Sequence, residues 1–247
     1  MRGLVLALVS VLVVFFVVPV SYANNVVVDP QVSISWQDAT GAGGQWSMAF
    51  PVGQELRVGG KEGSVSLSGA DNLNKYGLQS SGLTYFNMAF NTDPYITGGF
   101  AFINGTLSTQ TYTIIFQSPV TPAITPSTLY GGSMSGSFTA DPTAAMVTTT
   151  LNTPLYWGMI DGSPVLPIYN DPSSWSAAAN ASGTIAAVNM VPPTLVGPAA
   201  NNNISIQFKF TLTPGDTATM NGAFVVIPEP ATLALLGLGG LLMCRKK

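Results

Sequence analysis

The chain has 247 residues, of which 8 are Lys or Arg, 11 are Asp or Glu, one is Cys and none is His. Without His there is no imidazole base or ligand, and a single Cys excludes a disulfide framework and a thiolate metal cluster. Charged residues make up 8% of the chain, against about 25% in typical soluble domains, so we expect an ordered protein with an uncharged polar surface and no cofactor.

The N-terminus has the three parts of a secretory signal peptide. Arg2 precedes an uncharged, mainly apolar stretch at 4–20, and small residues stand at Ser21 and Ala23. We therefore expect signal peptidase to remove residues 1–23 by cleavage after Ala23. A retained membrane helix is the alternative, although the stretch 4–20 is near the lower length limit for spanning a bilayer.

The exported region, 24–227, is dominated by a period of two. Apolar and polar residues alternate from Val32 to Trp36 and again from Ile204 to Leu212, as in strands with one buried face. A turn at 214–216 leads into a last strand at 218–227. The pattern predicts an all-β fold: a single antiparallel β-sandwich domain, jelly-roll or immunoglobulin-like, with ten to twelve strands. The best candidate for a helix in this region, 174–181, is no longer than two turns.

Two hairpins are expected from turn residues. Asn104-Gly105 is typical of a type I′ turn, which would place Phe102 opposite Leu107. Asp141-Pro142 would similarly join a strand at 134–140 to one at 147–151.

Glu55 and Glu62 are the two glutamates of the exported region, and they flank a Gly59-Gly60 turn. In a two-residue turn Arg57 lies opposite Glu62, which favours a surface ion pair. The enzymatic alternative is a general acid and base pair, as in a glycoside hydrolase.

Four aspartates that precede proline are interpreted as turn residues, because Asp and Pro favour successive positions of a type I turn. They are Asp29, Asp93, Asp141 and Asp171. A calcium site built from Asp161, Asp171 and loop carbonyls is the alternative, although no Asp-x-Asp-x-Asp loop is present.

Large aromatic side chains are candidates for stacking on sugar rings. Tyr156, Trp157 and Trp175 stand beside Gly, Pro, Asp and Ser, and are the best candidates for exposure. Packing beneath a loop is the alternative for each of them. Trp36 alternates with apolar residues and is expected in the core.

The C-terminus combines Pro228-Glu229-Pro230, a mostly apolar segment at 231–244 and the basic tail 245–247. As a helix the fourteen-residue segment would be about 21 Å long, short of the roughly 30 Å hydrocarbon core of a bilayer. The basic tail should stay in the cytoplasm, which places the preceding domain across the membrane. We expect a short, transient transmembrane helix, preceded by an extended segment that a processing enzyme can bind.

Residues 226–239, read with the basic tail, resemble the PEP-CTERM sorting signal of Gram-negative bacteria. The resemblance covers about the last twenty residues. It implies recognition at Pro228, Glu229 and Pro230 by exosortase, a membrane-embedded transpeptidase-like enzyme, and removal or replacement of the tail. Such systems typically accompany exopolysaccharide production. A simple C-terminal membrane tether is the alternative.

These features predict a non-enzymatic protein of the cell surface or extracellular matrix, associated with exopolysaccharide or biofilm. Its expected partners are signal peptidase and exosortase during export, the inner membrane transiently, and exopolysaccharide. Trimming leaves four basic and ten acidic residues, and this net charge of −6 argues against nucleic acid. The alternatives are a lectin-like carbohydrate-binding module, with or without calcium, and a carboxylate-based glycoside hydrolase.

Overall fold

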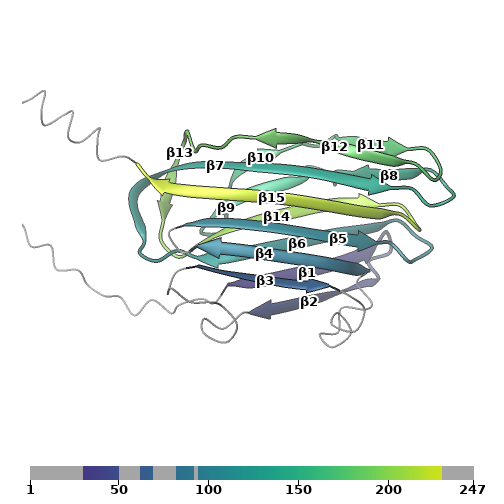
Figure 1. Cartoon of the computed structure of the whole chain (residues 1–247), viewed down its shortest axis with the longest axis horizontal. Coiled ribbons are helices and arrows are strands. Elements are labelled where there is room, and N and C mark those ends of the chain that lie inside the picture. The colour runs from purple at the N-terminus through teal and green to yellow at the C-terminus, as the bar shows by residue number, and fades with distance from the viewer. Residues whose placement is uncertain (1–29, 50–61, 69–81, 92–93, 230–247) are drawn as a thin grey trace, which may run out of the picture.

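The computed structural model describes residues 30–49, 62–68, 82–91 and 94–229, and they form two antiparallel sheets (Figure 1). The strands of sheet A are β1 (Gln31–Asp38), β2 (Gly43–Ala49), β6 (Gln110–Pro119), β8 (Ala145–Thr148), β9 (Tyr156–Ile160), β10 (Ser163–Ile168), β11 (Ser174–Ala177) and β14 (Asn203–Leu212). The strands of sheet B are β3 (Glu62–Ser68), β4 (Leu83–Asn91), β5 (Tyr95–Ile103), β7 (Ile124–Thr139), β12 (Ser182–Asn189), β13 (Leu195–Ala200) and β15 (Thr217–Pro228).

Sheet A has the order β10-β9-β14-β6-β1-β2, with β8 pairing with both β14 and β11. Sheet B has the order β12-β7-β15-β5-β4-β3, with β13 as a further partner of β7. The all-β sandwich class is therefore confirmed. The described residues form more strands than the ten to twelve expected, because short strands such as β8 and β11 extend sheet A. In this part of the chain no residue is helical, and so no helix there is long and apolar enough to cross a membrane.

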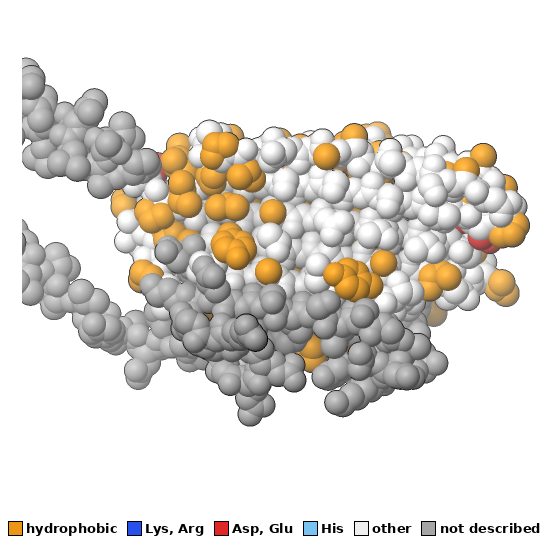
Figure 2. Space-filling model, viewed as in Figure 1, with side chains coloured by type: hydrophobic (Ala, Val, Ile, Leu, Met, Phe, Trp, Pro, Cys, Tyr) orange, Lys and Arg blue, Asp and Glu red, His pale blue; other side chains and the backbone are white. Residues whose placement is uncertain are grey.

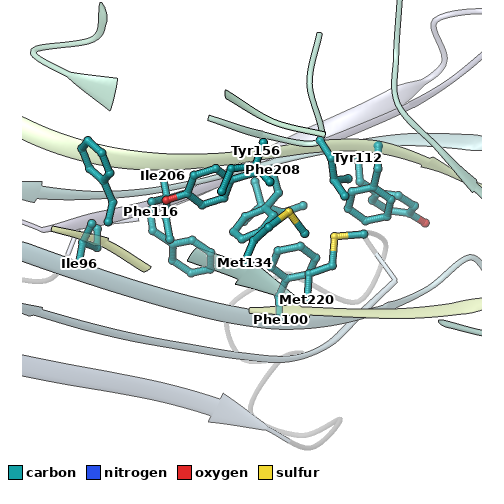
Figure 3. Close-up of a cluster of buried hydrophobic side chains, with 14 of the residues drawn as sticks. Ile96, Phe100, Tyr112, Phe116, Met134, Tyr156, Ile206, Phe208 and Met220 are labelled. Atoms are coloured by element: carbon teal, nitrogen blue, oxygen red, sulfur yellow. The ribbon is translucent and has the colours of Figure 1, made fainter. Parts of the chain in front are cut away.

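The two sheets pack through alternate side chains, which form an aromatic core (Figure 3). Phe100 on β5 meets Phe208 on β14 edge to face, with ring centroids 5.0 Å apart, and it stacks on Phe210 at 6.0 Å. All three side chains are fully buried. Aromatic pairs in these geometries add to the stability that burial alone gives.

Three of the strands expected from the period of two are confirmed. The alternation beginning at Val32 forms β1, and the alternation from Ile204 to Leu212 forms β14, with its apolar residues fully buried. The last strand is β15, which begins directly after the expected turn at 214–216. The connection from β14 to β15 crosses from sheet A to sheet B.

The hairpin expected around Asn104-Gly105 is wrong. The preceding strand β5 belongs to sheet B and the following strand β6 to sheet A, so the segment 104–109 crosses between the sheets. Phe102 faces Leu83 and Ala218 instead of Leu107, which is fully exposed. The physical reason is that Asn104 is buried and forms hydrogen bonds with the loop that connects β14 to β15.

That contact defines a polar junction of Asn104, Asp141 and Asp216 at one end of the sandwich, where three crossings between the sheets meet. The Asn104 backbone N–H donates to the Asp216 carbonyl at 2.9 Å, and the Asn104 carbonyl accepts from Gly215 N–H at 2.7 Å. The buried Asp216 carboxylate accepts from Asp141 N–H at 3.0 Å and from the Thr213 hydroxyl. The segments that cross between the sheets are thus hydrogen-bonded to one another, and none of these three is the turn of a hairpin.

Two further expectations are wrong. The strand before Asp141-Pro142 is β7 of sheet B, and the strand after it is β8 of sheet A, so these two strands do not form a hairpin. The helix candidate at 174–181 instead contains strand β11, which pairs with β8. Trp175 in that segment faces Val147 across the pair, in the alternating pattern of a strand.

Both ends of the described chain lie at the end of the sandwich opposite the polar junction. Strand β15 starts beside Ile103 near the junction and ends at Pro228. Strand β1 starts at Gln31, which pairs with Gln117 near the far end of β6. In Figure 1 this is the end at which the yellow strand β15 finishes.

Candidate functional site

The first site is the place where the C-terminal signal leaves the sandwich. Strand β15 continues to Pro228, which lies opposite Thr128 on β7, and Ile227 lies opposite Leu129. The Thr128 hydroxyl is buried and donates to the carbonyl of Pro198 on β13 at 2.8 Å. The first proline of the Pro-Glu-Pro sequence is therefore part of the sheet.

Strand β15 is paired on both sides for most of its length but on only one side at its end. Pairing with β5 stops at Val225 opposite Tyr95, after which Val226 N–H donates to the Pro94 carbonyl at 3.1 Å. Ile227 and Pro228 pair with β7 alone. Glu229 is the last residue described, so Pro230, the segment 231–244 and the tail 245–247 lie outside the described residues, as does Ala23.

The second site is the outer face of sheet A, which carries amides and hydroxyls. One row across four adjacent strands consists of Gln45, Ser35, Thr113 and Lys209. The neighbouring positions along these strands, including Phe208, point into the core, so this row faces outward. Lys209 is the one cation in the part of the chain that the structure describes.

The adjacent outward row ends in an aromatic ring. It runs from Ser47 and Ser33 through Ile115 and Gln207 to Trp157 on β9. Trp157 is half-buried. Two open depressions of ≈ 380 and ≈ 450 Å³ lie on this face. The first is lined by the row from Gln45 to Lys209, and the second by Ser47, Ser33 and Ile115 of the adjacent row.

The structure separates the three aromatic residues that the sequence grouped. Tyr156 is fully buried and donates its hydroxyl to the Ala223 carbonyl at 2.7 Å, so its ring is in the core and not open to a sugar. Trp175 is half-buried and its ring meets Tyr169 edge to face at 5.1 Å. Trp36 is also half-buried and packs against the core. Of the three candidates, Trp157 is the one on the outer face of sheet A.

Asp161 and Asp171 do not come together. Asp161 begins the turn between β9 and β10, whereas Asp171 follows the other end of β10, about 20 Å away at strand spacing. The Asp161 carboxylate accepts from the backbone N–H groups of residues 201–203 at 2.8–2.9 Å. That of Asp171 accepts from the Thr149 hydroxyl at 3.0 Å and Asn152 N–H at 3.2 Å. A shared calcium site between them is excluded by this separation.

Local hydrogen bonds lower the pKa of two aspartates, Asp161 and Asp141. Burial raises the pKa of Asp161, but bonds from the backbone of 201–203 outweigh it and lower that pKa below 3.8. The Thr143 hydroxyl and N–H lower the pKa of Asp141, each donating at 2.6 Å. This bonding confirms the interpretation of Asp141 as a turn residue.

Most of the remaining candidate residues from the sequence lie outside the residues that the structure describes. Asp29, Asp93, Glu55 and Arg57 lie outside the described residues. Glu62 begins β3 opposite Asn91, and its backbone alone is described. The ion pair and the carboxylate pair both stay predictions.

The fold and the position of Pro228 define a β-sandwich whose C-terminal signal begins inside its last strand. Residues 226–247 match the family model of the PEP-CTERM protein-sorting motif. The match supports an exported protein that exosortase sorts, with transient anchoring through the C-terminus. It covers the motif and not the sandwich.

No curated protein matches this sequence. Among solved structures, the infectious bursal disease virus VP2 subviral particle is 10% identical, with a TM-score of 0.23 over 80% of this chain and 56% of that chain. The GH31 alpha-xylosidase from Xanthomonas citri is 10% identical, with a TM-score of 0.17 over 78% of this chain and 18% of that chain. The chain thus spans little more than half the length of the first structure, and likeness at these scores carries no argument.

Proposed function

We propose that this is a non-enzymatic surface or extracellular-matrix protein of a Gram-negative bacterium, delivered by two terminal signals. Signal peptidase removes residues 1–23 after Ala23. The segment 231–244 then anchors the protein transiently in the inner membrane while exosortase binds Pro228, Glu229 and Pro230. The observation that carries this proposal is the sorting-motif match at residues 226–247, directly at the end of β15.

Mass spectrometry of the protein recovered from cells and medium tests this pathway. We expect an N-terminus at Asn24 and a C-terminus without the basic tail 245–247. In a strain lacking exosortase the tail should be retained. A full-length tail in a strain that makes exosortase would overturn the proposed processing.

We further propose that the outer face of sheet A associates with polysaccharide. Gln45, Thr113 and Gln207 offer amide and hydroxyl groups that can bond sugar hydroxyls, and Lys209 can pair with an acidic sugar. Trp157 borders the same face, where an aromatic ring can stack on the apolar side of a sugar ring. The depressions on this face are open and not enclosed, which suits a polymer more than a small ligand.

Retention of the purified protein by the host's own exopolysaccharide tests this role. Trp157→Ala and Gln207→Ala should each weaken retention several-fold. Asn221→Ala, on the outer face of sheet B, is the matched control and should not. Equal retention of all variants would place the contact elsewhere, and no retention of the native protein would overturn the role.

The same assay separates the alternatives. Calcium-dependent retention would favour a lectin-like module of the calcium type. Turnover of the polysaccharide that is lost in Glu55→Gln or Glu62→Gln would favour a carboxylate-based glycoside hydrolase and contradict the non-enzymatic proposal.

A further inference from the structure

The outer face of sheet B becomes apolar at the end where the sorting signal leaves. Val196, Leu129 and Ile227 form one row across β13, β7 and β15. Tyr95 and Val225 form a neighbouring pair on the same face, two positions back along β15. We call these five residues the exit patch.

The exit patch faces solvent and not the core. Val226 and Ile96, which alternate with patch residues along their strands, are fully buried and point inward. Val196 is 68% exposed, and Ile227 is exposed as well. Figure 2 shows hydrophobic side chains gathered over this end of β13, β7 and β15, while most of the face is polar.

The apolar surface continues beyond the strands themselves. Met190 and Val191, both exposed, come from the segment that leads into β13. Met190 is bonded to the sheet through its N–H, which donates to the Gly132 carbonyl at 2.8 Å. Contiguous exposed apolar side chains of this kind mark a contact surface, whereas single ones are normal on any protein.

The course of the chain identifies what covers this surface. Ile227 is four residues before Ala231, the start of the apolar segment 231–244, and four extended residues span at most about 14 Å. Whenever that segment is in a bilayer, the exit patch is therefore within a short distance of the lipid surface. Tyr95 adds an amphipathic ring of the kind enriched at membrane interfaces.

We propose that the exit patch rests on the lipid surface while the protein is anchored, and so orients the sandwich with the polar junction away from the membrane. The contact is with the boundary between headgroups and acyl chains, where apolar side chains enter by about 5–10 Å. This inference rests on the proposed anchoring through 231–244. It adds an orientation that a flexible tether would not give.

The test uses the full chain in phosphatidylcholine–phosphatidylglycerol vesicles that contain a lipid with a nitroxide quencher high on the acyl chain. The native Cys244 is replaced in Cys244→Ser, and a polarity-sensitive fluorophore is attached in Val196→Cys. The matched control is Leu107→Cys in the same background. Leu107 is fully exposed and follows β5, whose length places it about 26 Å beyond the patch end.

We expect a blue-shifted fluorophore at residue 196, with quenching at least about threefold greater than at residue 107. Equal quenching at both positions would show unoriented adsorption and overturn the proposal. A blue shift at residue 196 without quenching would mean that protein covers the patch, either the segment 231–244 or a second copy. That result would also overturn it.

A fluorophore on the native Cys244 reports anchoring separately. If Cys244 is quenched and residue 196 is not, the anchoring stands and the orientation fails. If Cys244 is not quenched either, the segment 231–244 is not in the bilayer, and both the anchoring and the orientation are wrong.

Discussion

Gly158 on β9 lies against the ring of Phe224 on β15, across the space between the two sheets. A Cβ at residue 158 would lie 2.6 Å from two carbons of that ring, nearer than real contacts allow. Gly158→Ala should therefore lower the free energy of unfolding by about 1–3 kcal/mol, the usual cost of overpacking a core. Urea unfolding of the purified protein measures it.

The control for this substitution is Gly105→Ala, because a Cβ at residue 105 has no atom within 4 Å. It should change stability by less than about 0.5 kcal/mol. Adding Phe224→Leu to Gly158→Ala should recover part of the loss, since the smaller side chain relieves the clash. Full additivity of the two losses would contradict the direct contact.

Asp161→Asn tests the carboxylate that binds the backbone of 201–203. Asn accepts the positive φ of 50° at this position, so the turn is kept while one acceptor oxygen is lost. We expect a loss of about 1 kcal/mol, at the low end for charged hydrogen bonds because the group is partly exposed.

The loss from Asp161→Asn should depend on pH. The folded pKa of Asp161 lies below 3.8, so its stabilisation is present above that pH and disappears as pH falls through the folded pKa. Unfolding curves of both proteins from pH 7 to pH 2 should therefore converge in acid. A difference that persists undiminished at pH 2 would rule out the carboxylate as its source.

Asn104→Ala removes the side chain that links two crossings at the polar junction. The buried amide donates to the Ser108 carbonyl at 2.9 Å and the Leu212 carbonyl at 2.8 Å. Leaving a buried carbonyl unpaired should cost about 2–4 kcal/mol for the two bonds together. Asn202→Ala, at an exposed side chain, is the control for thermal unfolding and should cost under about 0.5 kcal/mol.

Two buried tyrosines should make stability fall in alkali. Burial raises the pKa of Tyr112 to about 12 and raises the pKa of Tyr156 well above 10. Their neutral forms favour folding fully below about pH 10, the unfolded value, and this contribution is lost as pH rises toward the folded values. Phenolate absorbance should show these groups titrating last.

Tyr156→Phe separates the hydroxyl from the ring. The hydroxyl donates to the Ala223 carbonyl, and its loss should cost about 1 kcal/mol at neutral pH. An unchanged unfolding free energy at neutral pH would show that this bond contributes nothing net. The ring contact with Phe208, at 5.3 Å between centroids, should remain.

The sequence predicted strands better than it predicted their partners. The alternation from Ile204 to Leu212 is visible because each strand buries one face, which is a local property. Partners are not local. Asn104-Gly105 resembles a hairpin turn, but the Asn104 amide is used to bond the end of β14, more than a hundred residues away. The sequence between Phe102 and Leu107 carries no mark of that distant bond.

One further turn is marked by its local sequence. Asp161-Gly162 joins β9 and β10 with positive φ angles of 50° and 76°, as expected for a type I′ turn. Tyr156 and Trp157 precede this turn, and their alternation decides which ring is buried. A strand that ends at this turn places Tyr156 and Trp157 on opposite faces, with Tyr156 in the core and Trp157 at the surface.

The C-terminal sorting motif was predicted from local residues, because a proline-flanked apolar segment with a basic end is contiguous in the chain. The outer face of sheet A was not predicted. Its rows combine Gln45 of β2, Thr113 of β6 and Lys209 of β14, and only the register of the folded sheet places them side by side.

Strand β15 is the last strand of the sandwich, yet it lies between β7 and β5 inside sheet B. During translocation, therefore, the strand that emerges last is the one that joins the two parts of the sheet. Until residues 217–228 arrive, β7 and β5 each present an open edge that other chains can pair with. Because the sorting motif begins within the same strand, the motif follows every other strand of sheet B along the chain. Exosortase can therefore bind the motif only when all strands of the sheet are available to pair.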